Sequence, residues 1–171
     1  MRTETRKERY NKKLNSSFKY PVEIACINFK HEPNIGYVIR AAACFGSPIV
    51  NIIGDCPSDK ILKELSGSTS QFIKLQKFSN PHDFLTYCRE NNIKIVSAEL
   101  TDNARNIYDY EYPKDSKVCI VVGNEQTGVP SEILYCSEVV QIPMPGVGYC
   151  LNTAMSANIM LFEYTKQMAT A

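Results

Sequence analysis

Short apolar runs that alternate with helix-like segments are the feature that most limits what this chain can fold into. Runs rich in Val and Ile predict strands, whereas apolar residues three and four apart predict helices. The expected strands cover 22–29, 49–53, 72–75, 93–98, 118–122 and 139–142, and the expected helices cover 34–45, 61–65, 81–90, 130–135 and 154–164. Because these strands are almost continuously apolar and mostly separated by helices, the chain is predicted to be α/β, a single-domain parallel sheet with helices on both faces.

Charge is concentrated at the N-terminus. Residues 1–19 contain seven Lys and Arg against two Glu, a local charge of +5, so the rest of the chain carries −4 because the whole has +1. We expect residues 1–20 to form a basic arm that precedes a domain at 21–171. Such an arm suits contacts with nucleic acid phosphates, and a merely solvated polar tail is the alternative.

Composition excludes several classes of protein. No stretch of about 18 apolar residues could span a membrane, and the charged N-terminus does not resemble a signal peptide. The seven cysteines include no CxxC pair, which favours reduced thiols over disulfides or zinc ligands. We therefore expect a cytoplasmic protein with no membrane contact and no metal site.

The loops that follow strands are the most informative, because parallel sheets bind ligands outside the carboxyl ends of their strands. The first such loop leads into the helix expected at 34–45, where Asn34 is placed to cap the helix and Gly36 allows another backbone to approach. Arg40 lies in an otherwise apolar helix. Its interpretation is open between a functional group and a structural salt bridge.

Two further loops carry unusual residues. In 120–130, IVVGNEQTGVP, Glu125 lies between Gly123 and Gly128, without a GxGxxG or P-loop pattern. In 142–164, IPMPGVGYCLNTAMSANIMLFEY, a loop rich in Pro and Gly precedes the last helix. Asn152 is a candidate cap for that helix, and the loop itself is of the kind that holds a ligand.

Together these three stretches resemble the motifs of the SpoU, or TrmH-like, branch of the SPOUT superfamily of RNA 2′-O-ribose methyltransferases. The resemblance covers the chain after about residue 21 and implies a C-terminal trefoil knot, a rare exception to the rule against knots. It also implies a cleft for S-adenosylmethionine. The residues that it assigns to cofactor binding are Leu100, Gly123, Ile142, Met144, Cys150 and Leu151.

The catalytic residues that the resemblance implies are Arg40, Asn34, Glu125 and Asn152. Arg40 is the family's proposed base, but a guanidinium is effectively always protonated, so we assign it to holding the target phosphate and polarising the 2′-oxygen. Asn34 would orient Arg40 or the ribose, Glu125 would anchor Arg40 or a backbone amide, and Asn152 would fix the crossing loop. His31 is an alternative base.

One position departs from the family pattern. The third motif usually reads Ser-Leu-Asn, whereas Cys150 precedes Leu151 and Asn152 here. A thiol is a weaker hydrogen-bond partner than a hydroxyl, so we expect a backbone contact at this position. A nucleophilic Cys150 is the alternative, although the sequence identifies no histidine beside it.

The expected partners are RNA, with tRNA favoured by the compact chain, and a second copy of the chain. Apolar residues at Met155, Ile159 and Phe162 share one side of the last helix and would support a homodimer. A non-catalytic knotted RNA-binding or assembly protein is the alternative function. A Rossmann-type oxidoreductase would need a glycine fingerprint that the chain lacks.

Overall fold

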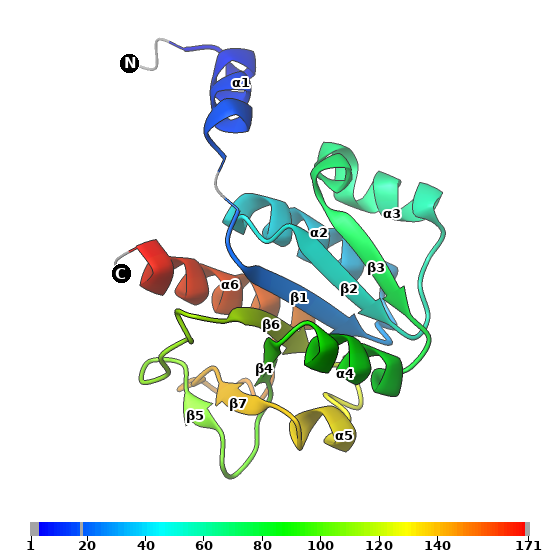
Figure 1. Ribbon diagram of the computed structural model, residues 1–171, viewed down its shortest axis with the longest axis vertical. Coiled ribbons are helices and arrows are strands. Elements are labelled where there is room, and N and C mark those ends of the chain that lie inside the picture. Colours follow the sequence, from blue (N-terminus) through cyan, green and yellow to red (C-terminus); the bar gives the residue numbers. More distant parts are fainter. Residues whose placement is uncertain (1–3, 18, 170–171) are drawn as a thin grey trace.

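The computed structural model describes residues 4–17 and 19–169, which fold into one parallel sheet flanked by helices (Figure 1). The strand order is β3-β2-β1-β6-β4-β7-β5, and every neighbouring pair is parallel. The strands are β1 Val22–Ile27, β2 Ile49–Ile53, β3 Lys74–Phe78, β4 Ile93–Ala98, β5 Arg105–Asn106, β6 Lys117–Val122 and β7 Glu138–Gln141. The helices are α1 Arg6–Ser16, α2 Glu32–Phe45, α3 Asp59–Ser66, the 3-10 helix η1 Gly67–Phe72, α4 Pro81–Glu90, α5 Ser131–Leu134 and α6 Thr153–Ala169.

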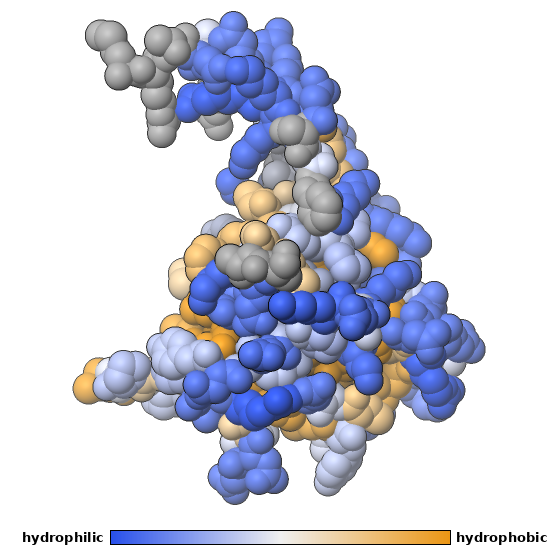
Figure 2. Space-filling model, turned by 60° about the vertical axis from the view of Figure 1, so that its left-hand side comes forward, coloured by the Kyte–Doolittle hydropathy of each residue, from blue (hydrophilic) through white to orange (hydrophobic). Residues whose placement is uncertain are grey.

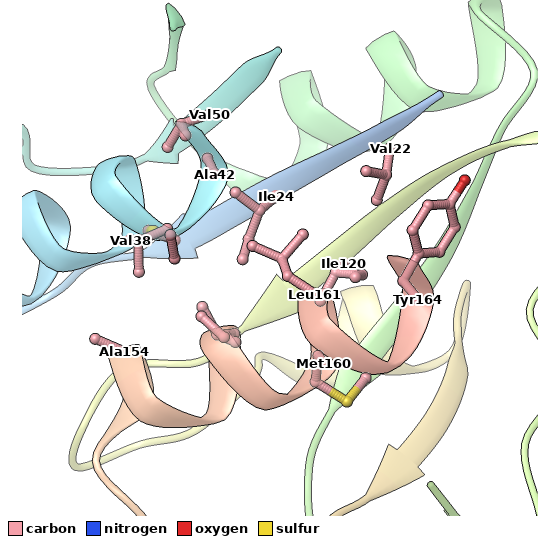
Figure 3. Close-up of a cluster of buried hydrophobic side chains, with 14 of the residues drawn as sticks. Val22, Ile24, Val38, Ala42, Val50, Ile120, Ala154, Met160, Leu161 and Tyr164 are labelled. Carbon is pink, nitrogen blue, oxygen red and sulfur yellow. The ribbon is translucent and has the colours of Figure 1, made fainter. Parts of the chain in front are cut away.

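The two faces of the sheet bury separate apolar cores, which explains why its central strands are mostly apolar on both faces. Successive side chains of a strand point to opposite faces. Ile24 and Ile120 therefore pack in the core covered by α2 and α6, whereas Ala25 and Val121 pack against α4 and α5. Figure 3 shows Leu161 of α6 beside Ile24 and Ile120 in the first of these cores. The predicted parallel α/β sheet with helices on both faces is confirmed.

Some predicted boundaries were wrong. The strand expected at 72–75 begins at Lys74, because residues up to Phe72 form η1. Helix α2 begins at Glu32, so Asn34 is not its cap. His31 takes the N-cap position without a side-chain bond, and a proline occupies the first turn of the helix.

Strand β7 lies between β4 and β5, although β4 and β5 are neighbours in the chain. Their link, residues 99–104, therefore bridges β7. Glu99 N–H donates to the Val140 carbonyl at 3.2 Å on one side, and Ile107 N–H donates to the Gln141 carbonyl at 2.9 Å on the other. Residues 99–116, which connect β4 to β6 and include β5, form a loop at this edge of the sheet.

That loop is fastened to α6. Gln167 donates to the Tyr110 carbonyl at 2.8 Å and accepts from Tyr112 N–H at 2.9 Å. The rings of Tyr110, Tyr112 and Tyr164 meet edge to face, with centroids 4.9 and 5.1 Å apart. The last helix is thus held against a segment that precedes it by about fifty residues in sequence.

The N-terminal segment, which was expected to be a basic arm, contains helix α1. Thr5 and Glu8 form a capping box at the start of α1, which supplies partners for N–H groups that would otherwise lack them. The helix stands away from the body in Figure 1, and Figure 2 shows it as almost entirely hydrophilic. Tyr10 reaches Phe72 of η1, with ring centroids 6.4 Å apart.

Candidate functional site

A cavity of about 550 Å³ opens where β4, β6 and β7 end. This is the edge at which parallel sheets bind ligands. The loops after these three strands line the cavity together with the beginnings of α2 and α6. Its lining residues are His31, Ala98, Glu99, Leu100, Val122, Gly123, Asn124, Glu125, Gln126, Gly128, Val140, Ile142, Met144, Tyr149, Cys150, Leu151, Asn152, Thr153 and Ser156.

The loop after β6 is closed tightly upon itself. Asn124 and Gly128 exchange two backbone hydrogen bonds of 3.1 and 3.0 Å. A Cβ added at Gly123 would lie 2.3 Å from the carbonyl carbon of Gly128, so a side chain does not fit there. The Asn124 side chain accepts from the N–H groups of Gln126 and Thr127 at 2.8 and 3.1 Å. This geometry turns Glu125 toward the start of α2.

Glu125 is bound by the N-terminal end of α2. Its carboxylate accepts from Lys30 N–H at 2.8 Å, from His31 N–H at 3.3 Å and from the Asn34 side chain at 2.7 Å. Burial raises the pKa of Glu125, but these hydrogen bonds outweigh burial and hold the pKa below its usual value. The carboxylate therefore stays ionised, which the positive end of a helix also favours.

Asn34 links the first motif to the third. Its side-chain oxygen accepts from the Asn152 side chain at 3.1 Å, and the Asn152 oxygen in turn accepts from Ala154 N–H at 2.9 Å. Asn152 thus caps α6 as predicted. The neighbouring Thr153 hydroxyl donates to the Gly123 carbonyl at 2.9 Å. Residues from all three sequence motifs therefore meet in one hydrogen-bonded network beside the cavity.

Arg40 does not belong to this network. It is exposed on α2 between the buried residues Ile39 and Ala41, and it does not line the cavity. Its side chain makes no hydrogen bond or ion pair with any other residue of 4–17 and 19–169. The alternative interpretation of Arg40, a structural salt bridge, is therefore not found among the described residues. Glu125 was expected to anchor either Arg40 or a backbone amide, and the structure shows it bound to backbone amides.

The cavity contains every residue that the resemblance assigns to the cofactor: Leu100, Gly123, Ile142, Met144, Cys150 and Leu151. Sequence reasoning missed Glu99 and Tyr149, which also line it. Glu99 could have been found, since it directly follows the strand predicted at 93–98. His31 and Cys150 both line this cavity, and no hydrogen bond joins them within the described chain.

Exposed apolar side chains extend along the neighbouring helices α2 and α6. Tyr37 of α2 is 53% exposed, while Met155 and Phe162 of α6 are 61% and 56% exposed. Phe162 also packs edge-on to Phe45, with ring centroids 6.2 Å apart. Arg40 is exposed on the same helix as Tyr37.

Residues 4–17 and 19–169 hold no group of three or more His, Cys, Asp or Glu side chains that could bind a metal ion. Within the same ranges, no helix combines the length and apolar character needed to cross a bilayer.

The fold is that of a SPOUT-type methyltransferase domain. The model of the SpoU rRNA methylase family matches residues 21–162, and the chain belongs to this family. Among curated relatives, the tRNA (guanosine(18)-2′-O)-methyltransferase of Thermus thermophilus is 26% identical over 175 residues, covering 99% of this chain and 87% of the relative. The Escherichia coli enzyme of that name is 23% identical over 155 residues, and the match covers 90% of this chain and 67% of the relative.

Other relatives are longer. This chain spans only 10% of the mouse protein named tRNA (guanosine(18)-2′-O)-methyltransferase TARBP1, at 27% identity over 161 residues and 91% of this chain. Among solved structures, the Aquifex aeolicus TrmH/SpoU tRNA modifying enzyme has a TM-score of 0.81 at 22% identity, covering 96% of this chain and 84% of that one. An rRNA methyltransferase from Sinorhizobium meliloti with bound AdoMet has a TM-score of 0.80 at 23% identity, and the match covers 88% of this chain and 58% of that one. These structures share the fold.

Proposed function

We propose that this protein transfers a methyl group from S-adenosylmethionine to a ribose 2′-hydroxyl of tRNA. The observation that carries the proposal is the network of Glu125, Asn34 and Asn152, which joins the three family motifs at the wall of the cavity. The Thermus and Escherichia relatives are named as tRNA 2′-O-methyltransferases, and the Sinorhizobium neighbour holds AdoMet. The name of these relatives and the ligand of this neighbour both agree with the chemistry of the cavity lining.

The cavity fits an adenosyl cofactor. Its volume lies in the range of about 300–1,000 Å³ that is typical of small-molecule sites. Leu100, Ile142, Met144 and Leu151 offer apolar surface to a purine. Residues 143–151 make no hydrogen bond with other groups of the described chain, so the main-chain groups of this loop, including those of Cys150, are free to bind a ligand.

S-adenosylmethionine supplies an electrophilic methyl group on a sulfonium. The chain must place a ribose oxygen in line with that methyl group and favour loss of the hydroxyl proton. We assign the phosphate and the 2′-oxygen to Arg40, whose guanidinium stabilises negative charge on both. The role of Asn34, Glu125 and Asn152 is to hold the cavity loops in register. His31, exposed at the cavity, is the alternative base.

The position of Arg40 favours catalysis by a homodimer. Because Arg40 is exposed and does not line the cavity of its own chain, we infer that it acts at the cavity of a second copy. The apolar side chains of Met155, Ile159 and Phe162 offer a surface for that contact. A C2 dimer would use this patch on both subunits and would complete two equivalent sites.

We assign RNA binding outside the cavity to the N-terminal residues 1–20, ahead of a methyltransferase domain at 21–171. Helix α1 presents Lys7, Arg9 and Lys13 to solvent, and such residues bind phosphates by releasing counterions. Residues 1–3 and 18 lie outside the described ranges. A tRNA substrate and free thiols both suit a cytoplasmic location.

We also propose that the C-terminal segment forms the trefoil knot implied by the family resemblance. The placement of β7 between β4 and β5, together with the contacts of Gln167 to the loop at 99–116, supports this topology.

The test is methyl transfer itself. The purified protein, labelled S-adenosylmethionine and unmodified tRNA should give 2′-O-methylated RNA. Maps of 2′-O-methyl groups in RNA from cells with and without the gene identify the nucleotide that loses its methyl group. A non-catalytic RNA-binding protein is the alternative. It would bind tRNA, show no S-adenosylmethionine binding in calorimetry and leave the RNA unlabelled.

A further inference from the structure

The cavity is lined by two carboxylates and no Lys or Arg side chain from the described residues. Glu99 and Glu125 come from the ends of different strands, β4 and β6. The remaining ionisable lining groups are His31, Tyr149 and Cys150. A ligand in this cavity therefore meets a formal charge of −2 when the histidine is neutral.

Hydrogen bonds fix both carboxylates in place without cancelling their charge. Glu99 accepts from Leu100 N–H at 2.8 Å and from Val129 N–H at 2.9 Å, which ties the end of β4 to the loop after β6. Glu125 accepts only from two backbone N–H groups and one side-chain amide. No ion pair of the described chain involves either residue. An ionised carboxylate can accept about four hydrogen bonds, so Glu99 keeps lone pairs for a ligand.

We infer that Glu99, together with Glu125, makes the cavity select the charged methyl donor over the uncharged product. The inference rests on the proposed function. S-adenosylmethionine carries a sulfonium, an ammonium and a carboxylate, for a net charge of +1. Loss of the methyl group leaves a neutral thioether, so S-adenosylhomocysteine has a net charge of zero. The two molecules differ at the cavity by one positive charge and one methyl group.

The size of the cavity sets the scale of the effect. A compact space of about 550 Å³ is about 10 Å across, which is close to the Debye length of about 10 Å at 0.1 M salt. A cation inside the cavity is therefore incompletely screened from Glu99 and Glu125. At an effective dielectric constant of about 20 this distance gives a preference of roughly tenfold for each carboxylate.

The experiment uses three ligands with the full-length protein. S-adenosylmethionine and sinefungin are positively charged at the reacting position, whereas S-adenosylhomocysteine is not. Calorimetry of the wild-type protein should give Kd values at least about tenfold lower for both charged ligands than for S-adenosylhomocysteine. Raising the salt from about 0.05 to about 0.5 M should reduce the ratio. Sinefungin separates charge from the methyl group, since it carries an amine and no transferable methyl.

Glu99→Gln should reduce the ratio of the Kd values severalfold, while Glu132→Gln, the same change at an exposed residue of α5, should leave it unchanged. The ratio is informative even if the new amide side chain loosens the loop, because a general loss of affinity affects all three ligands alike. If that variant does not fold, the salt dependence of the wild-type ratio decides.

Equal Kd values for sinefungin and S-adenosylhomocysteine in the wild-type protein would overturn this inference and leave the proposed function standing. An unchanged ratio in the folded Glu99→Gln variant would do the same. Failure of all three ligands to bind would overturn the proposed function as well.

Discussion

The contacts of Glu125 with the start of α2 predict how the stability of the protein responds to Glu125→Gln. In this variant one side-chain oxygen still accepts from Asn34 or His31, but an NH₂ group faces the Lys30 N–H, which donates at 2.8 Å in the wild type. A hydrogen bond to a charged group contributes about 1.5–3 kcal/mol, and a donor left without a partner adds a desolvation cost. Because the side chain is partly exposed, we expect a loss of about 2 kcal/mol in the free energy of unfolding.

The pKa of Glu125 determines how this difference in stability changes with pH. Burial raises the pKa of Glu125 and hydrogen bonds lower it by more, so the folded-state pKa lies below the ordinary value of 4.5. The stabilisation from the ionised group is therefore complete above the unfolded-state pKa and disappears as the pH falls through the lower folded-state pKa. The difference between wild type and Glu125→Gln should be constant at neutral pH and should shrink below about pH 4.

Urea unfolding of both proteins between about pH 7.5 and about pH 3.5 measures this difference directly. Glu132→Gln, a charge change at an exposed residue, is the control and should cost little at any pH. A Glu125→Gln protein as stable as the wild type near neutral pH, or a difference that stays constant down to the acid end of this range, would refute the assignment of Glu125 as the anchor of α2.

Four other changes test separate parts of the structure. Arg40→Ala should lower turnover by orders of magnitude with little change in S-adenosylmethionine affinity, because the side chain does not line the cavity of its own chain; kinetics and calorimetry together check this. Cys150→Ser should keep or raise activity in the same assay, whereas a catalytic thiolate would be lost. Removal of residues 1–18 should weaken tRNA binding and flatten its salt dependence in filter binding while leaving the cofactor Kd nearly unchanged. Gly123→Ala should lower the melting temperature and abolish cofactor binding, since its Cβ would meet Gly128 at 2.3 Å.

Local signals predicted much of the fold. The strand at 49–53 and the helix at 81–90 agree with β2 and α4, because the first is a compact apolar run and the second begins at a proline after a capping Asn80. Strand β5 was missed. Arg105 and Asn106 are exposed and polar, so their pairing depends on β7 arriving beside them and not on their own sequence.

The site was harder to predict in its contacts than in its members. Asn34 lies 91 residues from Glu125 and 118 from Asn152, so no local pattern shows that the three form one network. Asn34 was interpreted as a helix cap because short polar residues favour that position. The helix instead starts at Glu32, and its proline-containing first turn leaves the Asn34 side chain free to join the other two loops.

The placement of β7 also determines when the cavity can form during synthesis. A nascent chain that has emerged only as far as α5 can pair β6 with β1 and β4, but β5 must then wait about 10 Å from β4, two strand spacings away, with no neighbour between them. Closure depends on residues 138–141 entering that gap and on Gln167 reaching Tyr110. Assembly of the cavity therefore follows the synthesis of both β7 and α6. In the proposed knot the C-terminal segment has to be threaded, so a tightly folded fusion partner at the C-terminus should slow this step far more than the same partner at the N-terminus, with the equilibrium stability little changed.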